Sequence, residues 1–154
     1  MHKNEKGFSL IELLIVVAII LIIAAIAIPD LMKSRIAAAE SAVVGNLRAA
    51  NTGAFTYSTS INPAQGFPMV STAQWTEVTD PSLSAALGVA GGIKGGYKYT
   101  YTPVASAGVN VTYTIVAVPQ AIGSTGKRGF YTDESGVIRY TLDGTAPTSV
   151  SPTL

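Results

Sequence analysis

The feature that most constrains this chain is an apolar run near its N-terminus, from Phe8 to Ile28, in which Glu12 is the only charged residue. As an α-helix these 21 residues would extend about 31 Å, close to the ~30 Å hydrocarbon thickness of a bilayer. The run is apolar on every side rather than along one stripe, which is typical of a membrane-embedded or fully buried helix. Lipid or protein must therefore cover this segment.

Glu12 is the residue that an ordinary membrane segment does not explain. An ionised carboxylate within a bilayer costs about 2.5–3.5 kcal/mol on insertion scales, and such groups usually have a partner. One alternative is a cleaved secretory signal, with Lys3 and Lys6 as its basic region and 25–27 as its small-x-small cleavage site. The others are an uncleaved signal anchor and an ordinary buried helix. None of them gives the carboxylate a role.

The stretch Lys6-Gly7-Phe8-Ser9-Leu10-Ile11-Glu12 resembles the class III prepilin signal of type IV pilins and type II secretion pseudopilins. The resemblance implies that a prepilin peptidase removes residues 1–7 by cutting between Gly7 and Phe8, and that the new amine of Phe8 is N-methylated. It also implies that Glu12 pairs with the Phe8 amine of a neighbouring subunit, which sets the register of assembly. Such a pair would offset the cost of an isolated carboxylate in an apolar core.

The same resemblance implies where the protein is found and what it contacts. The subunit is expected to cross the inner membrane once, in contact with lipid, and then to form an extracellular pilus or a periplasmic pseudopilus. The implied partners are other copies of the chain in a helical filament, prepilin peptidase, the inner-membrane assembly platform and minor pilins. The implied functions are adhesion and motility for a pilin, and protein secretion for a type II secretion pseudopilin. A signal-anchored extracytoplasmic binding module is the alternative from another class.

The chain beyond the apolar run continues as a helical pattern. Pro29 lacks an N–H and predicts a kink, after which apolar residues recur at steps of three or four. We expect one helix over about 8–56, with a hydrophobic half (8–29) and an amphipathic half (30–57). The apolar stripe comprises Met32, Ile36, Ala39, Val43, Leu47, Ala50, Ala54 and Tyr57. The pattern places Lys33, Glu40 and Asn51 off the stripe, and Arg35, Glu40 and Arg48 are candidates for contacts between subunits or for solvated charges.

Residues 58–154 read as a globular head. Asp80 and Pro81 predict the start of a short helix over 81–87, and the glycine-rich segment 89–96 reads as a flexible connector. Alternating residues predict four antiparallel strands near 97–102, 109–115, 130–132 and 137–140. The expected fold is therefore α+β, a long bent helix packed on an antiparallel sheet of about four strands, similar to the pilin fold. The tail 145–154 is expected to be flexible.

Composition limits the chemistry. The chain has no cysteine and one histidine, His2 in the leader. Because the sequence shows no recognisable pair of a catalytic nucleophile and a base, an enzyme is not expected. The lack of cysteine also departs from the many type IV pilins that close their C-terminal region with a disulfide. With 10 basic and 9 acidic residues and no basic cluster, nucleic acid is not expected as a ligand. No cofactor is expected except calcium, for which Asp133, Glu134 and Asp143 could supply oxygens; turn formation explains the same residues.

Overall fold

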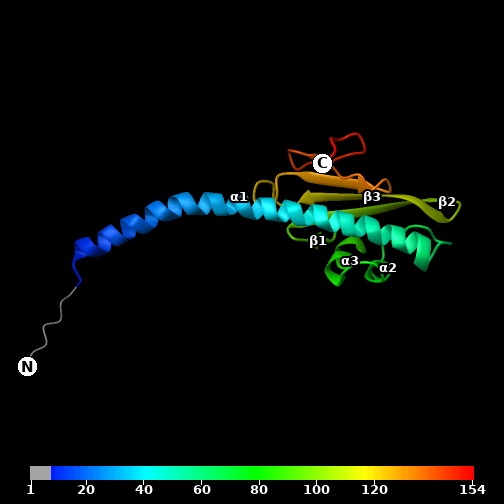
Figure 1. The fold of residues 1–154 in the computed structure, drawn as a ribbon, viewed down its shortest axis with the longest axis horizontal. Coiled ribbons are helices and arrows are strands. Elements are labelled where there is room, and N and C mark those ends of the chain that lie inside the picture. The colour runs from blue at the N-terminus through cyan, green and yellow to red at the C-terminus, as the bar shows by residue number, and fades with distance from the viewer. Residues whose placement is uncertain (1–7) are drawn as a thin grey trace, which may run out of the picture. The chain divides into compact units, whose positions relative to one another are not determined.

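The computed structural model describes residues 8–154, which divide into two units, 8–35 and 36–154. The leader residues 1–7, including Gly7, lie outside the described part. Helix α1 (Leu10–Thr56) begins in the first unit and ends in the second. The long helix expected over about 8–56 is therefore confirmed, with its first turn starting at Leu10 (Figure 1). A wider turn, η1 (Tyr57–Ile61), follows it.

In the first unit, α1 continues through Pro29 without interruption. Because proline has no N–H, the carbonyl of Ala25 lacks its usual helical donor; the predicted kink itself stays a prediction. Within residues 8–154, α1 is the one helix that is long and apolar enough to cross a membrane, and no residue of its most apolar window is buried. Residues 8–154 therefore supply no cover for this segment.

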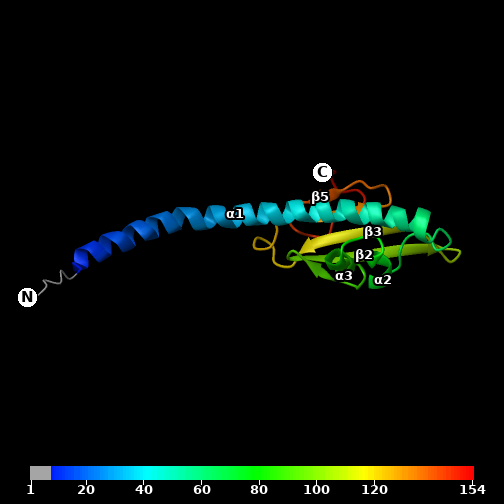
Figure 2. The same ribbon diagram turned by 60° about the horizontal axis from the view of Figure 1, so that its bottom comes forward.

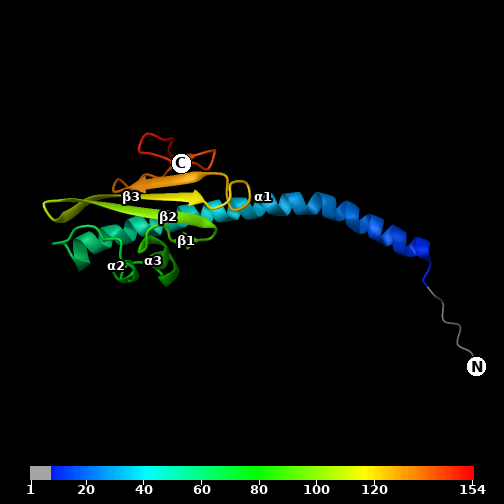
Figure 3. The same ribbon diagram turned by 180° about the vertical axis from the view of Figure 1, so that it is seen from behind.

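The second unit contains an antiparallel sheet in the order β1-β2-β3-β4-β5, so that each strand pairs with its neighbour in the sequence. This confirms the expected α+β fold. The strands are β1 (Ile93–Lys94), β2 (Tyr97–Ser106), β3 (Val109–Pro119), β4 (Gly129–Asp133) and β5 (Arg139–Thr141). Seen from behind, β2 and β3 lie in front of α1 (Figure 3).

The fifth strand corrects the sequence analysis, which expected about four strands and a flexible connector over 89–96. Strand β1 pairs with β2 in the register Lys94↔Tyr97, which leaves a two-residue turn of Gly95 and Gly96. Both glycines have positive φ, 61° and 79°. A two-residue hairpin that follows the twist of its strands needs positive φ at both turn positions, and glycine adopts it without strain. The glycine pair therefore makes a tight hairpin.

The hydrophobic core of the second unit lies on one face of the sheet. Tyr97, Tyr99 and Tyr101 alternate inward along β2, while Lys98, Thr100 and Thr102 are exposed. Part of α1 covers this face (Figure 2), together with α2 (Thr72–Thr76) and α3 (Pro81–Leu87). Helix α3 has the range expected for it, with the Asp80 side chain accepting hydrogen bonds at its start. Helix α2 was not predicted.

Asn51 was placed off the apolar stripe, and the structure shows that this is wrong. It is buried, its Nδ2 donates to Thr132 Oγ1 at 2.8 Å, and its Oδ1 accepts from the Tyr113 hydroxyl at 3.0 Å. The buried face of α1 is wider than an aliphatic stripe, and a polar side chain can lie on it when its nitrogen and oxygen each have a hydrogen-bond partner. Asn51 thus joins α1 to strands β3 and β4.

The tail 145–154, expected to be flexible, is tied to the edge of the sheet. Thr153 forms an antiparallel bridge with Arg139 of β5. The Tyr140 N–H donates to the Pro152 carbonyl and the Leu154 N–H to the Ile138 carbonyl, both at 2.9 Å. Backbone donors and acceptors of an edge strand need partners, and the tail provides them here.

We expect Asn51→Ala to lower the free energy of unfolding by about 1–3 kcal/mol, because it leaves the buried hydroxyls of Thr132 and Tyr113 without a partner. Denaturant unfolding of the detergent-solubilised chain measures this through Trp75, the one tryptophan, which is fully buried. Thr52→Ala, at the next and exposed position, is the control and should change stability by less than about 0.5 kcal/mol. Equal stability of the two variants would contradict the role given to Asn51.

Candidate functional site

The first unit presents an apolar surface that the described residues leave exposed. Among the large apolar side chains from Phe8 to Met32, exposed fractions run from 47% at Val17 to 85% at Phe8. An exposed apolar surface of this extent marks a site of contact with protein or membrane in a folded chain. The candidate functional site is therefore the segment 8–35 itself.

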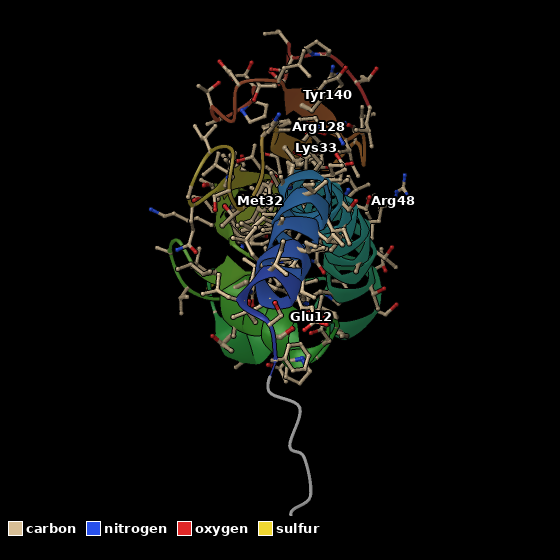
Figure 4. All side chains as sticks on the ribbon, turned by 90° about the vertical axis from the view of Figure 1, so that its left-hand side faces the viewer. Glu12, Met32, Lys33, Arg48, Arg128 and Tyr140 are labelled. Atoms are coloured by element: carbon tan, nitrogen blue, oxygen red, sulfur yellow. The ribbon has the colours of Figure 1, made fainter. Side chains whose placement is uncertain are left out.

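The start of α1 gives Glu12 a partner within its own chain. Ser9 is the last residue before the helix, and its backbone N–H donates to Glu12 Oε2 at 2.9 Å. Figure 4 shows Glu12 near this end of α1. A glutamate at the third helical position that reaches back in this way satisfies one of the free N–H groups of the first turn. The carboxylate also lies at the positive end of the helix dipole.

This hydrogen bond was missed in the sequence analysis, which gave Glu12 only a partner in another subunit. The spacing of Ser9 and Glu12 is that of a helix-capping pair and could have revealed it. The structure places Phe8 just outside the helix and exposes it, whereas Gly7 lies outside the described residues. Cleavage after Gly7 and methylation of Phe8 therefore stay predictions.

The apolar surface ends in a short charged band. Lys33 Nζ lies 3.2 Å from Asp30 Oδ1, and the two side chains are 75% and 70% exposed. An exposed pair one helical turn apart contributes only about 0.3–0.5 kcal/mol. Asp30 is thus only weakly held by its partner within the chain.

Glu40 is an acidic residue of α1 that the sequence analysis placed wrongly. It was a candidate for a subunit contact or for a solvated charge, but its side chain is only 8% exposed and binds within the second unit. Oε1 accepts from the backbone N–H groups of Lys127 and Arg128, at 2.9 and 3.1 Å, and Oε2 accepts from Arg128 Nε at 2.7 Å. A buried carboxylate needs such partners to offset its desolvation. Glu40 therefore fixes the β3–β4 connection to α1.

Arg128 completes this cluster. Its guanidinium carbon lies 5.4 Å from the ring centre of Phe130 and 5.7 Å from that of Tyr140, distances suited to cation–π attraction. Figure 4 shows Arg128 and Tyr140 near each other. Burial raises the pKa of Glu40, but hydrogen bonds from Lys127 and Arg128, with the Arg128 charge, outweigh it and lower the pKa below its ordinary 4.5. The carboxylate is held ionised.

The structure does not bring the calcium candidates together. Asp133 Oδ1 accepts from the backbone N–H and hydroxyl of Ser135, and Asp143 Oδ1 accepts from those of Thr145 at 3.1 and 2.7 Å. Within residues 8–154 no group of three or more histidine, aspartate or glutamate side chains is placed to hold a metal ion. The geometry matches turn formation, and calcium binding with Glu134 stays an untested prediction.

Comparison with known proteins points to the same segment. Residues 2–28 match the model of the prokaryotic N-terminal methylation motif. Over 45 residues the chain is 53% identical to the type IV wide pilus major component PilA4 of Thermus thermophilus, a match that covers 29% of this chain and 34% of that protein. The match thus spans about a third of the length of the relative. No solved structure matches the chain significantly. The resemblance of the N-terminal segment to type IV pilins is confirmed.

The Glu40 cluster predicts a pH dependence. Because its pKa is lower in the folded state, its contribution to stability is present above about pH 4.5 and is lost as the pH falls through the folded-state value. Glu40→Gln should lower the free energy of unfolding by about 1.5–3 kcal/mol at neutral pH, and this difference from wild type should become smaller in acid. Denaturant unfolding at a series of pH values measures this, with exposed Glu77→Gln as the control. A deficit that stays constant into acid would contradict the assignment.

Proposed function

We propose that this chain, whose N-terminal segment carries the signal of type IV pilins, is the structural subunit of a type IV pilus-like filament. Prepilin peptidase would cut between Gly7 and Phe8 and the Phe8 amine would be methylated. Helix α1 would hold the subunit in the inner membrane until assembly. The observation that carries the proposal is the methylation motif over 2–28 at the start of an apolar helix with no buried residue in its most apolar window.

In the proposed function the apolar segment is buried in two successive environments, first the membrane and then the filament. In the membrane, lipid tails cover residues 8–28; in the filament, the helices of other copies do. Lipid is as apolar as leucine, so burial of apolar area by itself does not favour the filament over the membrane. Close packing and polar contacts between helices must therefore supply the free energy that favours the filament over the membrane. A charged group in the apolar segment can contribute to it by forming such a polar contact.

Glu12 is the group that can make such a contact. Before cleavage Phe8 offers it no cation, because its nitrogen is bonded as an amide to the leader. Cleavage creates an amine at Phe8, and a carboxylate has enough lone pairs to accept from that amine and from Ser9 together. We expect the amine of a neighbouring subunit to be the partner, since the pair then forms only between correctly placed copies. Cleavage would thereby make the subunit competent for assembly.

The second unit would form the part of the subunit that faces the surroundings of the filament, in a structural rather than catalytic role. A pseudopilin of a type II secretion system would share the cleavage and the methylation. The match to a pilus major component supports the pilus. Filaments confined to the periplasm would identify a pseudopilus instead. A mature N-terminus near Pro29 would identify a signal-anchored binding module.

The test of the proposal is the mature N-terminus and the fate of Glu12 variants. Mass spectrometry of wild-type filaments should find a chain that begins at methylated Phe8. In Glu12→Ala we expect cleavage to persist while filament assembly is lost, with Glu77→Ala assembling normally.

Glu12→Gln separates the two contacts of the carboxylate, because an amide oxygen can still accept from the Ser9 N–H but carries no charge. We expect it to assemble as poorly as Glu12→Ala. Normal filaments from Glu12→Gln would show that capping, and not the charge pair, is what assembly requires.

A further inference from the structure

The exposed side of α1 in the second unit has an unusual composition. Between residues 36 and 56, its exposed positions carry small or hydroxyl side chains, one phenylalanine and a single charge. They are Ala37, Ala38, Ser41, Ala42, Gly45, Arg48, Ala49, Thr52, Phe55 and Thr56. A Cβ added at Gly45 would meet no atom within 4 Å. Another helix could therefore approach this side closely. Arg48 would then be the one charged side chain at the contact.

Arg48 has no acidic partner in the part of the chain that the structure describes. The ion pairs there join Lys33 to Asp30, Lys94 to Asp80 and Arg128 to Glu40. Figure 4 shows the Arg48 side chain pointing outward from the ribbon. The guanidinium group of arginine carries a positive charge. If apolar helices covered this side of α1, they would bury an unpaired cation, which is costly. Close packing thus requires a carboxylate opposite Arg48.

The segment that needs cover in the proposed filament offers two carboxylates, because residues 8–35 contain Glu12 and Asp30 and no other acid. Glu12 already accepts from Ser9 and is assigned to the Phe8 amine. Asp30 is 70% exposed, and its pair with Lys33 is weak. A carboxylate can accept from two cations at once, and an arginine can bind it through two parallel hydrogen bonds.

We infer that Arg48 of one subunit pairs with Asp30 of a neighbouring subunit, so that the segment 8–35 of one copy packs along the exposed side of α1 in another. This inference rests on the proposed filament. It also predicts a geometry: positions 30 and 48 are about 27 Å apart along an α-helix, so parallel helices joined by this pair are staggered by about that distance. The pair acts as a second register contact beside Glu12.

The lack of cysteine in residues 1–154 makes a direct test available. In the variant with Asp30→Cys and Arg48→Cys, the two thiols of one chain are too far apart to bond, because a disulfide needs Cα atoms within about 7 Å. Any bond between these positions must therefore join two copies. Oxidised filaments should give a ladder of covalent multimers on a non-reducing denaturing gel. Each single-cysteine variant, and Asp30→Cys with Glu77→Cys, should give no ladder.

Charge reversal covers the case in which the cysteine variant does not assemble. Asp30→Arg and Arg48→Asp should each reduce filament yield about tenfold or more, since like charges then face each other. The double variant, Asp30→Arg with Arg48→Asp, should restore most of the yield. The yield is measured on filaments sheared from cells, with total subunit followed separately.

The outcomes distinguish this inference from the proposed function. If the wild-type chain forms no filaments, the proposed function is overturned and the inference with it. If wild-type filaments form but the cysteine pair gives no ladder and the double reversal gives no rescue, the inference alone is overturned. A ladder from Glu12→Cys with Arg48→Cys, in place of the one through position 30, would also overturn it.

Discussion

The structure depends on how one helix is covered along its length. Over residues 36–56 the sheet and two short helices bury one side of α1, whereas over residues 8–35 the described part of the chain leaves no residue fully buried. Apolar residues alone would let a thin helix of alanine and valine slide or rotate on a flat sheet face. Glu40 and Asn51 prevent this, because each makes directional hydrogen bonds to a defined point on the strands or their connection. Polar contacts fix the helix, and apolar contacts bury it.

The same division of roles explains the charges that remain exposed. A charge on the buried side of α1 is paired within the second unit, as Glu40 is with Arg128. A charge in the segment 8–35 has at most a local hydrogen bond or a weak pair, as with Glu12 and Asp30. Such groups add little to the stability of a folded monomer. They have a physical rationale once another copy supplies the partner, which is how the proposed filament accounts for them.

The sequence was sufficient to predict elements with a strong period or a specific motif. The length of α1, the capped helix at Pro81 and the long strands follow from spacing and from residues with a single structural preference. The signal at Gly7–Glu12 was predicted from its order of residue types. The hairpin at Gly95 and Gly96 was predicted to be a flexible loop, because a pair of glycines is typical of flexible loops and of tight hairpin turns alike. Glu40 and Asn51 could not be placed, because a helical period sorts residues by polarity and contains no information about distant partners such as Thr132 and Arg128.

The two edges of the sheet have a consequence for how copies of this chain can associate. One edge is β1, only two residues long, and the other is β5, which the C-terminal tail bridges through Thr153. Long free edges tend to pair with the edges of other molecules, and this becomes more frequent as copies are crowded together. A protein displayed at high density in one array would otherwise form mixed sheets between neighbouring heads. A short strand at one edge and a bridged strand at the other reduce this tendency, and in the proposed filament the exposed side of α1 would be the surface through which copies join.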